Sequence, residues 1–202
     1  MNELAVLQAL RLKGRASVSE LAEATDLALE VVCEQTDALL ASGGARELGA
    51  ALLLLPGARP RLDQLLSAER AGIDPASLAP HYDQFSAVNK DFKGLAAGWQ
   101  LRDGAPNDHG DPAYDQSILD QLPSIDRRVG PIVAAVAEIA PRLAPFARRF
   151  AAALAKVEAG EHQWFLKPLI DSYHTVWFEF HEELIAISGR NRLDEAAAGH
   201  AD

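Results

Sequence analysis

SVSELAEAT, residues 17–25, is the stretch that decides how the first part of the chain folds. Ser17 and Glu20 have the spacing of a capping box, in which each side chain bonds the other residue's backbone N–H and so starts a helix. The apolar residues that follow continue this helix for about two turns. Thr25-Asp26 then ends it, and Asp26 is placed to cap the next helix.

Further helices and a hairpin are expected on both sides of this stretch. Residues 3–13 repeat apolar positions at helical spacing, and residues 28–42 form a third helix that ends at Gly43-Gly44. The inner face of this third helix is predicted to carry Leu29, Val32, Cys33, Leu39 and Leu40. Residues 45–48 and 51–55 have the composition of two short strands joined by a turn, which predicts a hairpin. A fourth helix follows the hairpin.

The order helix, helix, helix, hairpin, helix resembles the winged-helix domains of bacterial transcriptional regulators of the MarR and GntR kind. The resemblance rests on residues 17–25, on the helix after Asp26, and on Leu54-Leu55-Pro56-Gly57-Ala58-Arg59 after the hairpin. It covers the first 70 or so residues and implies a recognition helix that enters DNA. Winged helices also serve as protein-pairing modules, since a fold does not fix a function.

A DNA contact would draw on few cations. On the third helix, Glu30 can accept from a cytosine amine and Gln35 can pair with adenine. Phosphate anchoring supplies most of the affinity in such contacts. The side chains predicted to provide it are Arg11, Lys13, Arg15, Arg46, Arg59 and Arg61. The net charge of −10 argues against a strong nucleic-acid binder and keeps the protein-pairing alternative open.

The rest of the chain differs in composition, because all thirteen aromatic residues and all six histidines lie beyond position 80. Apolar positions three and four apart predict a helix over residues 78–99, and residues 100–112 read as a polar loop. A second helical stretch, 114–138, contains Pro123 and Gly130-Pro131, which should kink or split it. Two further helices are predicted over 142–159 and 163–188.

The last predicted helix carries aromatic and histidine side chains with the composition of a small-molecule site. The predicted ligand-binding residues are Trp99, Tyr173, His174, Trp177 and His181. The alternatives are that these side chains fill the core, that His174 and His181 serve as structural or interface histidines, or that the two bind a metal. In the loop, Asp108, His109 and Asp111 are more typical of a solvated acidic segment than of a metal site.

Residues 180–191 also have a local similarity to the metal-binding helical effector domain of some GntR-type regulators. In that family an acidic residue stands four positions before the histidine, where this chain has Trp177, and further histidine-bearing helices follow. No metal and no cofactor is therefore predicted. Glycine-rich phosphate loops, G-x-S-x-G, H-E-x-x-H and zinc-type Cys/His spacings do not occur in the sequence, so no catalytic residue and no enzymatic activity is predicted either.

The sequence thus predicts an all-α, mainly helical fold. Residues 1–75 form a winged helix with a small β-hairpin, residues 76–190 form a helical bundle for dimerisation and effector binding, and residues 191–202 form a flexible tail. The lone Cys33, the lack of a secretory signal and the lack of a spanning apolar run predict a cytoplasmic protein without a membrane partner.

The predicted function is that of a homodimeric DNA-binding transcriptional regulator, with a small molecule as its effector. The alternative is a non-enzymatic accessory protein that docks on another protein through a degenerate winged helix. A third and weaker interpretation is a metal-dependent helical enzyme.

Overall fold

The computed structural model describes residues 2–190, and the tail predicted for residues 191–202 lies outside them. The fold is mainly helical with small antiparallel sheets, which confirms the predicted fold class. Residues 2–71, called the N-terminal unit here, comprise α1 (Asn2–Lys13), β1 (Arg15–Ala16), α2 (Val18–Thr25), α3 (Leu29–Ala41), β2 (Ala45–Leu48), β3 (Ala51–Leu54), a 3-10 turn (Pro56–Ala58) and α4 (Arg59–Ala71).

The capping box at the start of α2 is present as predicted. The Ser17 side chain accepts from the backbone N–H of Glu20 at 3.2 Å, and the Glu20 carboxylate accepts from the backbone N–H of Ser17 at 2.7 Å. Asp26 does not cap α3, contrary to the prediction. It lies in the left-handed region at the end of α2, with φ of 56°, and α3 begins three residues later, at Leu29, behind Ala28, which makes no side-chain cap.

The sheet has one more strand than predicted. Arg15 pairs with Leu53 and Ala16 with Leu52, so β1 joins the hairpin as an edge strand in the order β1-β3-β2. A two-residue strand is too short to show an alternating pattern in the sequence. Cys33 and Leu29 are exposed rather than inward, because the buried stripe of α3 runs through Val32 and Leu39, as predicted, and through Thr36.

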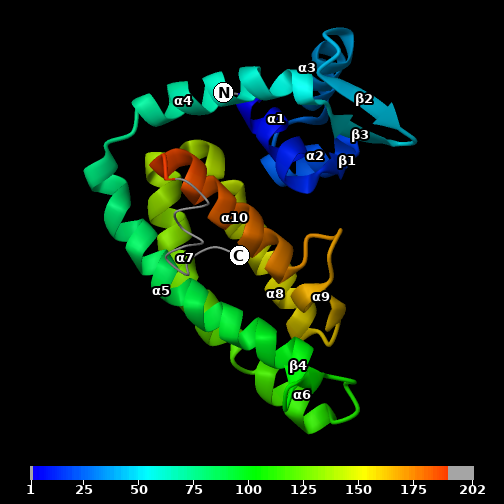
Figure 1. Cartoon of the computed structure of the whole chain (residues 1–202), viewed down its shortest axis with the longest axis vertical. Coiled ribbons are helices and arrows are strands. Elements are labelled where there is room, and N and C mark those ends of the chain that lie inside the picture. The colour runs from blue at the N-terminus through cyan, green and yellow to red at the C-terminus, as the bar shows by residue number, and fades with distance from the viewer. Residues whose placement is uncertain (1, 191–202) are drawn as a thin grey trace.

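Residues 75–190, called the helical body, comprise α5 (Pro75–Gln100), β4 (Leu101–Arg102), β5 (Ala105–Pro106), α6 (Pro112–Leu119), α7 (Leu122–Ile139), a 3-10 turn (Pro141–Leu143), α8 (Pro145–Glu158), α9 (Gln163–Leu166) and α10 (Tyr173–Ser188). α5 is the long helix along one side of the body in Figure 1, and α4 crosses from the N-terminal unit to its start. The predicted second helix is split into α6 and α7, and Pro131 is accommodated inside α7.

The last predicted helix, over residues 163–188, is also wrong as a single element. α9 ends before Lys167-Pro168, since proline disfavours a helical conformation in the residue that precedes it. Leu169 then adopts a left-handed conformation with φ of 66°. Ser172 restarts the helix by accepting from the backbone N–H of Thr175 at 3.3 Å, so α10 begins at Tyr173.

Two separate clusters of buried side chains underlie the fold. The cluster in the N-terminal unit runs from Leu4 to Leu62 and is built from aliphatic side chains. The cluster in the helical body runs from Leu78 to Ile187, with stacked aromatic rings at its centre. A domain boundary near residue 75 remains a prediction, because α4 contributes to the first cluster and also contacts α10.

Charged side chains connect the two parts. Arg142, from the 3-10 turn before α8, donates two hydrogen bonds to Glu69 of α4 and two to Glu183 of α10, at 2.6–2.9 Å. Gln8 of α1 donates to the same Glu183 at 3.2 Å. Burial opposes the charge of Arg142, but its two carboxylate partners outweigh this effect and raise its pKa. α10 is therefore joined by polar bonds to α1 directly and to α4 through Arg142.

A second group of buried charges lies beside the first. Arg149 of α8 donates to Asp171 at 2.8 Å and to Glu179 of α10 at 2.5 Å. Lys13, at the end of α1, reaches the same Asp171 at 2.6 Å. Charges this deeply buried are costly unless they are paired, so the pairing fixes how α1, α8 and α10 meet. Among the described residues, no helix combines the length and apolar character that a bilayer span requires.

Candidate docking surface on the N-terminal unit

Three of the side chains predicted to anchor DNA phosphates already contact carboxylates. Lys13 binds Asp171, and Arg11 lies 3.7 Å from Glu182 of α10. Arg61 donates two hydrogen bonds to Glu3, at 2.8 and 2.6 Å, and through them it lowers the pKa of Glu3. Lys13 is largely buried at the contact with the helical body, so it is not available to a phosphate in this arrangement.

The other three predicted anchors are exposed, and none forms an ion pair within residues 2–190. Arg15 and Arg46 both stand opposite Leu53 of the central strand, one on each side of it. Residues opposite one another in adjacent antiparallel strands project from the same face of a sheet. The two arginines therefore flank Leu53 on one face, and Arg59 stands apart at the start of α4.

α3 presents negative charge. Glu30, Glu34 and Asp37 are exposed and stand four and three residues apart, a spacing that places them along one side of a helix. Within the described part of the chain none of the three pairs with a cation. Gln35, predicted together with Glu30 to contact bases, is half-buried on the neighbouring side of α3. A duplex approaching this helix would meet three carboxylates before it met an amide.

A pocket of about 560 Å³ adjoins the acidic side of α3. Its apolar wall includes the buried side chains of Leu7, Leu39 and Ala58. The full lining comprises Glu3, Leu7, Gln35, Ala38, Leu39, Ser42, Gly43, Gly44, Gly57, Ala58 and Arg61. Ala38 stands one turn after Glu34, so the pocket and the carboxylates are next to each other on α3.

Gly44 allows this wall of the pocket to pack closely, because it has no Cβ atom. A Cβ atom at Gly44 would lie 3.3 Å from the Cβ of Ala58 and 3.3 Å from a methyl group of Leu39. The pocket has the make-up of a site for one apolar side chain, and the exposed carboxylates beside it favour a cationic neighbour of that side chain. No local sequence pattern indicates this pocket, because it forms only where α1, α3 and the turn at Pro56–Ala58 meet.

Four of the five predicted ligand-binding residues lie on α10, and the rings of Tyr173 and Trp177 are 6.2 Å apart. Trp177 is only 3% exposed, its ring stacks on Phe92 with centroids 4.3 Å apart, and its indole N–H donates to Asn89 at 2.7 Å. Tyr173 is fully buried, and its hydroxyl donates to Asp126 at 3.0 Å. Burial raises the pKa of Tyr173, and the charge of Asp126 adds to the effect. These contacts favour the core-filling alternative for both rings.

The two predicted histidines differ in surroundings. His181 is mostly buried, with its ring 5.1 Å from that of Phe85, whereas His174 is exposed. Trp99 lies near the far end of α5, and its ring neighbours among the described residues are His109, His162 and Phe165. A ligand-binding role for the set stays a prediction. In the described part of the chain no three His, Cys, Asp or Glu side chains are grouped to hold a metal ion.

Comparison of the chain with models of protein families, with curated proteins and with solved structures found no match.

Proposed function

We propose that this protein is a non-enzymatic interaction protein whose N-terminal unit docks on a partner protein. The observation that carries the proposal is the combination on α3 of exposed carboxylates with an adjoining apolar pocket of about 560 Å³. The partner element it suits is a cationic segment with one apolar anchor side chain. Interfaces are dominated by such buried anchors, while charges at the rim select the partner and its orientation.

The link to the helical body supports this proposal. Lys13 and Gln8 are bound to carboxylates of the helical body, so α1 serves to fix the N-terminal unit in place. The pocket lies among α1, α3 and the turn at Pro56–Ala58, and all of its lining residues come from the N-terminal unit. The helical body would thus hold the docking surface rigidly and leave it open. A cytoplasmic location and a homodimer formed through the helical body belong to this proposal as expectations.

A second candidate function is DNA binding through the sheet. The observation that favours it is the row Arg15–Leu53–Arg46, in which two exposed arginines share one face of the sheet. A transcriptional regulator that used this face would contact phosphates with the strands and not with α3. The two candidates use different side chains of the same unit, so charge reversals separate them.

The test uses two surface variants of the full chain and one control. Glu34→Lys combined with Ala38→Arg reverses charge on α3 and fills the pocket mouth, and Arg15→Glu combined with Arg46→Glu reverses the sheet face. Glu158→Lys, at the exposed end of α8, is the control for an acid-to-lysine change. A partner captured by the wild-type protein is purified and its affinity is measured by calorimetry.

If the surface on α3 docks a partner, the Glu34/Ala38 variant should bind that partner at least about tenfold more weakly, because both an anchor contact and a charge contact are lost. Glu158→Lys should leave the affinity unchanged. DNA binding would replace protein docking as the proposed function if the wild-type protein binds duplex DNA at low salt. In that case the Arg15/Arg46 variant should lose DNA binding and the Glu34/Ala38 variant should keep it. Partner affinity equal in all variants would contradict the docking surface.

A further inference from the structure

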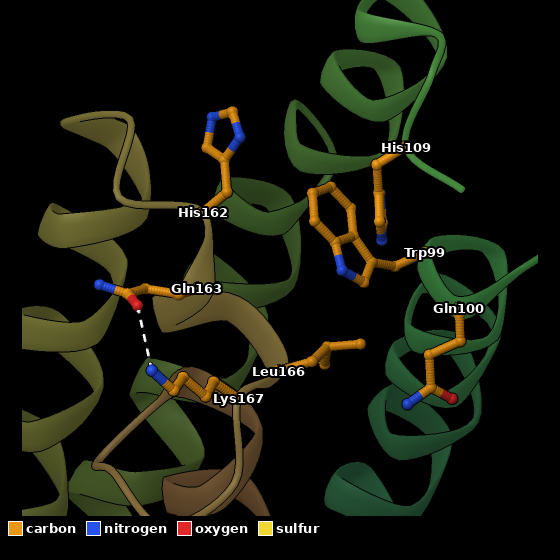
Figure 2. A pocket seen from close by; sticks show the side chains of 7 residues that line it. All are labelled: Trp99, Gln100, His109, His162, Gln163, Leu166 and Lys167. Carbon is orange, nitrogen blue, oxygen red and sulfur yellow. Dashed lines mark hydrogen bonds between the residues drawn. The ribbon is translucent and has the colours of Figure 1, made fainter. Parts of the chain in front are cut away.

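A second pocket, of about 470 Å³, lies at the end of α5 remote from the N-terminal unit. Figure 2 shows its seven lining side chains, which come from the end of α5, from the loop before α6 and from the segment around α9: Trp99, Gln100, His109, His162, Gln163, Leu166 and Lys167. Its volume is in the range of small-molecule sites. Nothing in the proposed docking function requires it.

Trp99 provides a flat apolar surface in this pocket. Its ring lies 4.6 Å from the ring of His109 and 5.5 Å, edge to face, from that of Phe165. The backbone around it is held firmly, because the carbonyl of Trp99 accepts from Asn107 at 3.0 Å and that of Gly98 accepts from the Tyr114 hydroxyl at 2.9 Å. Leu166 adds an aliphatic side chain below the indole ring in Figure 2.

His109 is oriented by a buried carboxylate. Its Nδ1 lies 3.0 Å from one oxygen of Asp115, whose other oxygen accepts from Asn107 at 2.9 Å. A carboxylate can only accept, so Nδ1 carries the proton of this bond, and Nε2 of the neutral ring can accept a hydrogen bond but not donate one. Asp115 is 7% exposed and already contacts two other side chains, so it is not itself a ligand-binding group.

The charge of the lining selects the ligand. The protein has a net charge of −10, yet none of the seven lining residues is a carboxylate. Lys167 is the cation, with its ammonium 3.3 Å from the Gln163 amide oxygen, and His162 and His109 supply imidazole groups. Two imidazoles without a third ligand do not make a metal centre. Amide, imidazole and ammonium donors around an indole suit an anion attached to a ring.

We propose that this pocket binds a small molecule made of a flat aromatic ring and one carboxylate or phosphate group. The ring packs on Trp99 and Leu166, and the anionic group accepts hydrogen bonds from the ammonium of Lys167 and from the imidazole N–H of His162. A carboxylate and a phosphate share this chemistry, and separate probes for each distinguish them.

The experiment titrates the full chain with two pairs of probes, each an anion and its uncharged counterpart: 1-naphthoate with 1-naphthamide, and adenosine 5′-monophosphate with adenosine. The three tryptophans give three indole N–H signals in a ¹H–¹⁵N NMR spectrum, and Trp99→Phe identifies the signal of Trp99. At least one anion should shift that signal and bind about tenfold more tightly than its uncharged counterpart.

Lys167→Gln and His162→Gln should each raise the dissociation constant of that anion about fivefold to tenfold. Lys90→Gln, on an exposed part of α5, should leave it unchanged. The indole signals of Trp164 and Trp177 report whether each variant keeps its fold. The proposal is overturned if no anion shifts the Trp99 signal at millimolar concentration, if charged and uncharged probes bind alike, or if neither Lys167→Gln nor His162→Gln changes the affinity.

Discussion

At the scale of single residues, Arg149 shows that a buried charged side chain depends on its carboxylate partners. Its side chain is 3% exposed and that of its partner Glu179 is 2% exposed. Burial alone lowers the pKa of Arg149, but the charge of Glu179 and the hydrogen bonds to Asp171 outweigh it and raise that pKa. Arg149 thus stays charged in the interior, where a lone charge would be costly.

Removing one partner should therefore cost far more than removing both. Arg149→Met is expected to lower the free energy of unfolding by about 3–5 kcal/mol, because the buried Glu179 is left with only its longer, 3.4 Å contact to Lys13. Adding Glu179→Met to that variant should restore part of the loss. The control, Arg148→Met, removes an exposed pair with Asp26 and should cost at most about 1 kcal/mol. Urea unfolding measures all three, and a double variant less stable than Arg149→Met would contradict the pairing argument.

Residue-level signals in the sequence predicted the fold better than the site. Ser17 and Glu20 marked the start of α2, because a capping box is local and its spacing is fixed. The partners of Arg142 lie 41 and 73 residues away, so no local pattern could identify them. The same holds for the pocket beside α3, and for His109, whose partner Asp115 is near in sequence but is buried only by the packing of α6.

At the scale of elements, the end of α10 depends on a glycine. Gly189 has φ of +70°, a conformation in which a side chain is strained. A Cβ atom there would also lie 2.9 Å from Cδ of Arg70, whose guanidinium donates to the carbonyl of Ala186 at 3.0 Å. The C-terminal end of α10 and the packing of α4 against it therefore depend on the same contact between Gly189 and Arg70.

Gly189→Ala should thus destabilise the protein more than the same change at a glycine with free space. Gly160→Ala, after α8, is the control, since φ there is +87° and no atom lies within 4 Å of a Cβ. The control should cost about 1–2 kcal/mol for the left-handed conformation alone. Gly189→Ala should cost about 1 kcal/mol more, for the displaced Arg70 bond. Equal unfolding free energies for the two variants would show that α4 adjusts without loss.

At the scale of the whole molecule, the contact between the N-terminal unit and the helical body should respond to acid. Burial raises the pKa of Asp171, but the hydrogen bond from Arg149 and the charges of Arg149 and Lys13 outweigh it and lower that pKa from 3.8 to about 2. A carboxyl whose pKa is lower in the folded state stabilises the fold above its unfolded pKa. This contribution is lost as the pH falls through the folded value.

The expected result is a pH-dependent difference between the wild-type protein and Asp171→Asn. Their unfolding free energies should differ most above about pH 4, and the difference should shrink as the pH falls toward 2, because protonated Asp171 resembles asparagine. Asp63→Asn, at an exposed position on α4, is the matched control and should show little difference at any pH. A difference between wild type and Asp171→Asn that is constant with pH would contradict the contact.

The position of α10 also has a consequence for the order in which the chain matures during synthesis. The aliphatic cluster of the N-terminal unit is complete once Leu62 has emerged from the ribosome. Arg142 and Arg149 emerge 41 and 30 residues before Glu183 and Glu179, so each lacks its partner on α10 until that helix arrives. The N-terminal unit can therefore fold early, as leading segments generally do. Its attachment to the helical body comes later, when α10 supplies both aromatic rings for the core of that body and the carboxylates Glu179 and Glu183.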